Sequence, residues 1–111
     1  MVEATLNRMC VNPMQDKVNG IRAMALEAQE DFGTARQSAS RPGGEARALQ
    51  KLRGELVRLY GMQQDLANAA QSDSERTLTD ELLTDLEQIN QQASAAINFT
   101  CTPLNELAAM Q

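Results

Sequence analysis

The sequence contains no histidine and no tryptophan, and only three of its 111 residues are aromatic. The lack of histidine excludes histidine-dependent catalysis and histidine metal sites. The lack of tryptophan excludes a tryptophan-based ligand cage. β-Branched residues are also scarce, and no segment alternates apolar and polar residues over a useful length. The sequence therefore predicts no β-strand.

Basic residues are few, since ten of them stand against fifteen acidic residues and give a net charge of −5. Domains that bind polyanions are normally basic, so we expect no nucleic-acid partner. The acidic excess lies in residues 72–111, which contain one base, Arg76, and seven acids. This last third could face a basic neighbour inside the molecule or outside it.

Long apolar runs are absent, and the N-terminus shows no basic leader followed by an apolar segment. We therefore expect no signal peptide and no membrane span, and a cytoplasmic location follows by default. The length predicts a single domain over residues 1–111, because each half of a divided chain would be too small for a stable core.

Apolar residues instead recur every three or four positions in three runs, the heptad spacing of helices that pack together. Asn12-Pro13 is a typical helix start. Pro42, Gly43 and Gly44 interrupt a helix. We predict helices at 13–39, 45–71 and 75–99, a short tail helix at 103–110, and a helical lead-in at 3–11. The predicted apolar stripes comprise Met14, Val18, Ile21, Ala25, Ala28, Phe32 and Ala35; Leu49, Leu52, Leu56, Leu59, Gln63, Leu66 and Ala70; and Leu78, Leu82, Leu86, Ile89, Ala93 and Ala96.

Ser72 and Glu75 form a predicted capping box for the third helix. Equal helix lengths and short connections predict an all-α, up-down-up antiparallel three-helix bundle with coiled-coil-like heptads. The stripes are wider than a two-per-heptad seam, as three or four helices around a core require. The residues that widen them are Leu26, Val57, Tyr60, Leu83 and Ile97. The sixteen alanines bury little area each, so we expect the bundle to be completed by dimerisation.

The two cysteines, Cys10 and Cys101, are expected to lie at opposite ends of such a bundle. A disulfide needs Cα atoms within about 7 Å, so we expect no bridge within one chain. The main hypothesis is two partly buried, small apolar residues, and the alternative is a bridge between chains. No histidine could activate a catalytic thiol.

Acidic residues cluster at Glu27, Glu30 and Asp31 and again at Glu81 and Asp85. Paired carboxylates could bind a divalent cation or transfer protons. They flank the apolar stripes, however, so we expect solvated faces, no metal and no cofactor.

The candidate interaction face lies on the second helix and comprises Arg47, Lys51, Gly54, Arg58 and Gly61, which heptad spacing places together. One hypothesis is a smooth basic strip that a partner or a phosphate group approaches. The other, which we favour, is an exposed face paired with acids of the third helix. The glycines still favour a contact, because exposed helix interiors usually contain better helix formers.

Gln63 is the candidate register residue, because one polar residue in an apolar stripe can define register or oligomeric state. The alternative places Gln63 at the bundle edge, where it reaches solvent. The methionines have helical spacing, and most of the six are expected to fill the core.

These features predict a non-catalytic helical module that self-associates or binds a helical protein partner, as an adaptor, chaperone or assembly subunit. The alternative is a bundle that binds a small molecule or an ion, in a gap left by alanines or on the acidic face of the third helix. An enzyme is not expected, because no nucleophile is arranged with a base and an orienting group.

Overall fold

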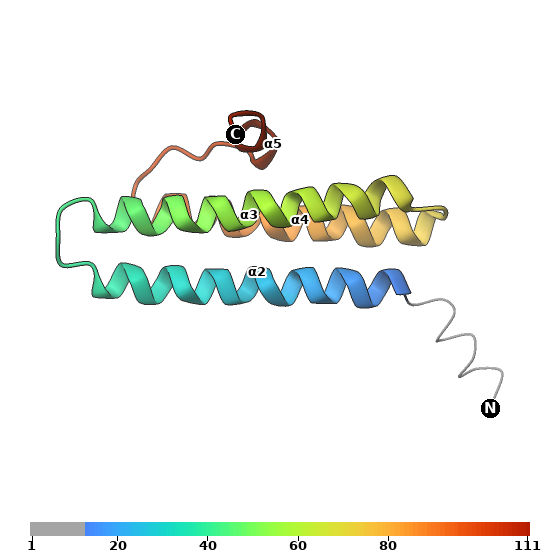
Figure 1. The fold of residues 1–111 in the computed structure, drawn as a ribbon, viewed down its shortest axis with the longest axis horizontal. Helices are drawn as coiled ribbons and strands as arrows, with labels where there is room; N and C mark the ends of the chain where they lie inside the picture. The colour runs from blue at the N-terminus through green and yellow to red at the C-terminus, as the bar shows by residue number, and fades with distance from the viewer. Residues whose placement is uncertain (1–12) are drawn as a thin grey trace, which may run out of the picture.

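The computed structural model describes residues 13–111, and its three long helices pack against one another. They are α2 (Pro13–Ser38), α3 (Gly44–Ala69) and α4 (Asp73–Ala96), followed by the short α5 (Leu104–Ala109). No strand occurs between residues 13 and 111. Figure 1 shows α2 and α3 running side by side in opposite directions. The predicted all-α, three-helix bundle is therefore confirmed.

The turn between α2 and α3 depends on two glycines. Gly43 has a φ of 82°, in the left-handed region that glycine adopts without a steric penalty. Gly44, which the sequence placed in the interruption, is instead the first residue of α3. A Cβ at Gly44 would lie 2.8 Å from the Cβ of Ala39, so the connecting turn approaches the start of α3 too closely there for any side chain.

The start of α4 is capped by Ser72, whose Oγ accepts a hydrogen bond from the Glu75 N–H at 3.2 Å. The carboxylate of Glu75 accepts from the N–H of Gln71 at 2.8 Å, one residue before the position that a capping box uses. The bond to Ser72 satisfies a donor that the helix itself leaves unpaired. At the other end, α4 stops at Ala96, and Asn98 has a φ of 58°.

The core is formed by the predicted stripes, with exceptions at their ends. Ala35 and Ala96, in the last turns of α2 and α4, are exposed. Leu26 was expected beside the core, but it is 51 % exposed in the groove between α2 and α4. The buried apolar residues are Met14, Val18, Ile21, Ala25, Ala28, Phe32, Ala48, Leu49, Leu52, Leu56, Leu59, Leu82, Leu86, Ile89, Ala93 and Leu104.

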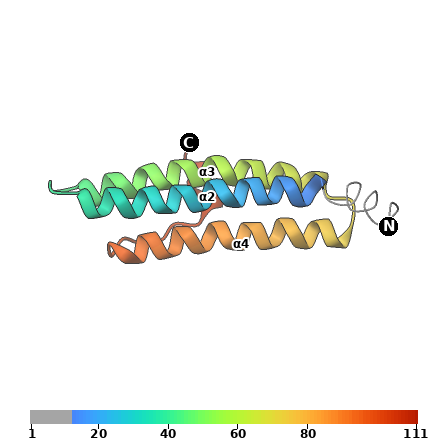
Figure 2. The same ribbon diagram turned by 90° about the horizontal axis from the view of Figure 1, so that it is seen from below.

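Because α3 reverses direction, α2 and α4 run parallel, and Figure 2 shows α4 along the other two helices. Two polar pairs connect them, and both join residues 63 positions apart. Arg22 Nε donates to Asp85 Oδ2 at 2.8 Å, and Gln29 Nε2 donates to Gln92 Oε1 at 3.4 Å. The pairs are one heptad apart, as the parallel arrangement of two heptad helices requires.

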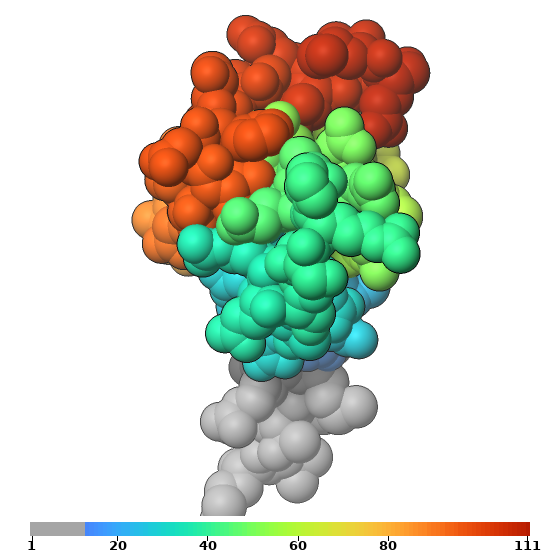
Figure 3. All heavy atoms as spheres, turned by 90° about the vertical axis from the view of Figure 1, so that its left-hand side faces the viewer, coloured from blue at the N-terminus to red at the C-terminus, as the bar shows by residue number. Residues whose placement is uncertain are grey.

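The tail, residues 97–111, turns back beside the bundle, and its helix α5 packs on α3. Figure 3 looks along the bundle from the α2–α3 turn and shows the orange-to-red tail next to the green atoms of α3. None of the helices within residues 13–111 combines the length and apolarity needed to cross a membrane. The predicted lead-in at 3–11 and Cys10 lie outside the described residues.

Candidate docking surface

An apolar hollow lies on the surface between α2 and α3 and has a volume of about 300 Å³. Five of its seven lining residues are glycine or apolar residues of α2 and α3, namely Gly20, Ile21, Met24, Met62 and Leu66. Met62 is 37 % exposed, and Met24 and Leu66 are partly buried against the core. We call this site the methionine hollow; it is lined by Lys17, Gly20, Ile21, Met24, Met62, Asp65 and Leu66.

Gly20 keeps the methionine hollow open. A Cβ built at Gly20 meets no atom within 4 Å, so no packing inside the chain requires glycine there. Glycine in a helix interior costs about 1 kcal/mol relative to alanine, and here it leaves space on the surface. Thioether side chains such as Met24 and Met62 adapt to irregular apolar surfaces.

Two opposite charges flank the methionine hollow. Lys17 belongs to α2 and Asp65 to α3, so the lysine and the carboxylate border one hollow from different helices. Both are exposed, and no ion pair joins them to any other described residue. The border is therefore positive along α2 and negative along α3.

The methionines were expected mainly to fill the core, and for two of the four described ones this prediction is wrong. Met14 is buried, whereas Met62 and Met110 are exposed. The signal that distinguishes Met62 is its place in the sequence, directly after Gly61 and directly before the buried Gln63. It therefore falls beside the stripe of α3, not on it.

The predicted basic face of α3 is exposed at all five positions, Arg47, Lys51, Gly54, Arg58 and Gly61. Cβ atoms built at both glycines meet nothing within 4 Å. The expected pairing of these bases with acids of α4 does not occur among the described residues, where the ion pairs of the chain use other arginines. Arg47 and Lys51 instead border an open hollow of about 370 Å³ at the α2–α3 turn, together with Arg41.

Gln63, the candidate register residue, is 1 % exposed, so its side chain does not reach solvent as the alternative hypothesis expected. Its Nε2 donates to the carbonyl oxygen of Thr79 at 2.9 Å, and its Oε1 accepts from Gln64 Nε2 at 2.7 Å. The first bond joins α3 to α4. A buried amide with both ends paired connects two helices at one level of the bundle.

Sequence reasoning missed a second polar group, where the tail meets α3 and α4. Asn90 and Ser94 are fully buried, and Arg53 donates to Ser94 Oγ at 3.0 Å. Asn90 and Ser94 are four residues apart and therefore share a helix face. The spacing of four residues was the only sequence signal that these two polar residues act together. Their helix face is buried because the returning tail covers it.

The five acidic residues of the two predicted clusters occupy solvent-facing positions or, in one case, an interhelical ion pair. Glu27, Glu30, Asp31 and Glu81 are exposed, and Asp85 pairs with Arg22. Within residues 13–111, no group of three or more metal-ligating side chains is placed to hold a metal ion. Cys101 is exposed and free, so the expected partial burial is wrong for this cysteine.

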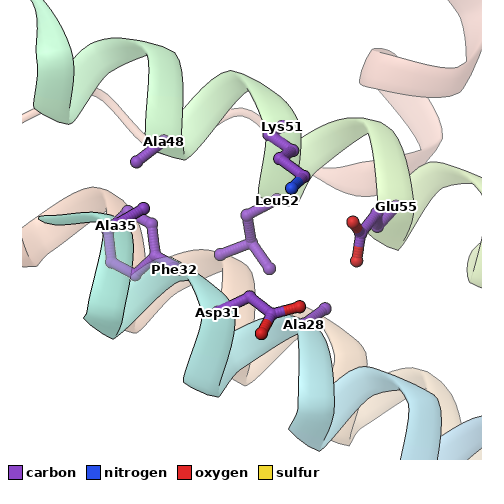
Figure 4. A pocket seen from close by; sticks show the side chains of 8 residues that line it. All are labelled: Ala28, Asp31, Phe32, Ala35, Ala48, Lys51, Leu52 and Glu55. Carbon is purple, nitrogen blue, oxygen red and sulfur yellow. The ribbon is translucent and has the colours of Figure 1, made fainter.

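The gap between alanines of α2 and α3 is small. Figure 4 shows Leu52 of α3 pointing toward α2 beside Phe32, with Asp31 and Lys51 at the edge. The hollow has a volume of about 30 Å³, the share of liquid volume of roughly one water molecule. A small-molecule pocket is usually on the order of 300 Å³ or more, so this gap does not accommodate a metabolite.

Comparison of the chain with family models, with curated proteins and with solved structures finds no match.

Proposed function

We propose that this protein is a helical interaction module, not an enzyme, and that it forms a dimer with a second copy of the same chain. The observation that carries this proposal is the methionine hollow, an apolar surface between two long helices. Large apolar side chains on a surface, bordered by polar residues, are typical of protein–protein interaction sites.

The charges that border the hollow favour a second copy as the occupant. In a two-fold dimer the same patch is used twice, so a residue that contacts its counterpart is contacted in return. When two such hollows face each other about an axis along α2 and α3, Lys17 of each copy meets Asp65 of the other. A partner with a single charge sign on its surface would leave one of these two groups opposed by a like charge.

The size of the face is also that of a stable dimer. Helices α2 and α3 have 26 residues each. At 1.5 Å per residue they are about 39 Å long, and side by side they are about 20 Å wide. The face is therefore on the order of 800 Å² per copy, the area of a standard interface. The pairing would place α2 and α3 of both copies around one shared core, which would add to the alanine-rich core of a single chain.

The groove between α2 and α4 is less suited to this role. Its volume is about 270 Å³ and it contains the exposed Leu26. The Arg22–Asp85 and Gln29–Gln92 pairs cross between the two helices on either side of Leu26. A partner in this groove would have to displace or desolvate both polar pairs, at a cost that the methionine hollow does not impose.

Light scattering of the full chain across a concentration series tests the proposal, with reductant present to remove any contribution of a disulfide. We expect a dimer for the wild type and for Gly33→Leu. We expect Gly20→Leu to weaken the dimer at least ten-fold, because the new side chain fills the hollow. Both glycines lie in α2 with open space at the Cβ, so they form a matched pair. A wild type that stays monomeric at all concentrations, or equal effects of both variants, would refute the proposal.

A further inference from the structure

The tail returns along a defined path. After α4 ends, Asn98 adopts its left-handed conformation and the N–H of Phe99 donates to the carbonyl oxygen of Ser94 at 2.8 Å. The chain then runs without regular structure to α5, which lies beside α3 (Figure 1). The tail therefore covers the seam between α3 and α4, the third seam of the bundle.

Three side chains of the bundle bind the main chain of the tail at alternate residues. Arg53 Nη2 donates to the carbonyl oxygen of Thr100 at 2.8 Å, and Asn90 Nδ2 donates to that of Thr102 at 2.7 Å. The N–H of Leu104 donates to Glu87 Oε1 at 2.7 Å. We call Arg53, Glu87 and Asn90 the tail clamp. Alternate main-chain contacts are the pattern by which a protein recognises an extended peptide.

Two leucines supply the apolar part of the contact. Leu104 is fully buried in the core cluster, and Leu107 is partly buried against it. The residues between and before them, Pro103, Asn105 and Glu106, are exposed. The site therefore selects an extended segment followed by a short helix with leucines three positions apart.

We infer that the seam between α3 and α4 is a peptide-docking site, and that it accepts the tail of a second copy in exchange for the chain's own tail. All clamp contacts go to main-chain atoms, and both leucines belong to the same segment, so an identical tail in another chain makes every contact again. Reciprocal exchange of such a segment loses no contact of the docked tail.

The position of Phe99 supports exchange. Phe99 is 47 % exposed at the point where the tail leaves α4, and straightening the chain there would allow Phe99 of two copies to pack together. This inference does not depend on the methionine hollow.

A labelled synthetic peptide of residues 98–111, with reductant present, tests the site in the full chain. Leu104→Asp places a charge in the core contact and releases the chain's own tail. We expect the peptide to bind this variant in a 1:1 ratio. We expect binding to the wild type to be at least ten-fold weaker, because a tail attached by a short linker competes at millimolar effective concentration.

The control variant adds Arg53→Glu and Glu87→Lys to Leu104→Asp. The two clamp substitutions preserve the net charge and lie at partly exposed positions, but they remove one donor and one acceptor of the tail clamp. We expect this variant not to bind the peptide. If the Leu104→Asp chain loses its helical circular dichroism, or keeps it without binding the peptide, the site does not exist as a separable peptide-docking site and the inference is wrong.

Mixing two full-length variants tests the second copy itself, with Gly20→Leu present in both to remove association through the methionine hollow. One variant carries Leu104→Asp and retains an intact clamp. The other carries Arg53→Glu and Glu87→Lys and retains an intact tail. We expect each alone to be monomeric by light scattering, and the mixture to form a 1:1 pair. A mixture that remains monomeric refutes tail exchange, whether or not the wild type dimerises through α2 and α3.

Discussion

At the scale of single residues, Gln63 is the polar residue that the heptad spacing identified within an apolar stripe. Its side chain is buried in the structure. Replacement by alanine should destabilise the chain by about 2–4 kcal/mol, because it leaves a cavity and removes the bond to Thr79. Leucine has a similar volume and needs no partner, so Gln63→Leu should keep most of the free energy of unfolding. Urea denaturation measures both changes.

The same pair of variants tests whether Gln63 determines register. If it does, Gln63→Leu should retain stability but lose a single packing arrangement, with a lower denaturant m value and broadened amide resonances. Sharp resonances and an unchanged m value in Gln63→Leu would show that the residue only fills space. Gln50→Leu is the matched control, because Gln50 is an exposed glutamine of the same helix.

Residue patterns predicted the apolar core well and the polar interior poorly. The buried stripes followed from spacing alone, because burial on a helix repeats every three or four residues. Asn90 and Ser94 could not be predicted, since asparagine and serine in a helix are ordinarily exposed and helical spacing does not show that the following segment folds back over them. The apolar hollow at Met62 could not be predicted from the sequence either, because methionine is suited both to a core and to an adaptable surface.

At the scale of elements, the six glycines of the chain have different roles, and substitution separates them. Gly54→Ala should stabilise the protein by up to about 1 kcal/mol, because alanine is the better helix former and the space at its Cβ is open. Gly44→Ala should destabilise it by about 1–3 kcal/mol, because its Cβ would clash with Ala39 at the start of α3. Thermal unfolding of both variants measures these opposite changes in stability.

The contrast between these glycines also tests the predicted basic face. If Gly54 has no role in association, Gly54→Ala should raise stability and leave self-association as it is in the wild type. A loss of association in Gly54→Ala, with the methionine hollow intact, would show that the face of Arg47, Lys51 and Arg58 takes part in the contact. Helix propensity alone identified Gly54 as unusual, but it could not identify Gly44, whose role depends on how closely Ala39 of the connecting turn approaches the start of α3.

At the scale of the whole molecule, the three seams of the bundle differ in what covers them. The seam between α3 and α4 is filled by the tail, and the seam between α2 and α4 is crossed by two polar pairs. The seam between α2 and α3 has an apolar hollow with opposite charges at its borders. This difference could not be predicted from the sequence, because the three stripes have nearly the same spacing, and spacing shows neither the return of the tail nor the side-chain pairs between helices.

The opposite charges of Lys17 and Asp65 make the proposed dimer testable by charge exchange. Lys17→Asp alone makes both bordering residues negative, and Asp65→Lys alone makes both positive, so each variant should be weaker as a dimer than the wild type. The chain that carries both substitutions should regain the dimer, because its borders are again opposite in sign. Light scattering at low ionic strength, where exposed charges are least screened, measures each mass.

Mixing the two single variants distinguishes a two-fold interface from a contact that merely contains these residues. In a mixed pair, the new aspartate of the Lys17→Asp chain faces the new lysine of the Asp65→Lys chain. The native Asp65 of the first chain then faces the native Lys17 of the second. A two-fold interface therefore predicts that two chains which fail to pair with themselves pair with each other. If the mixture stays monomeric while the doubly substituted chain dimerises, Lys17 and Asp65 contribute within one chain, and the second copy does not place its own charges opposite them.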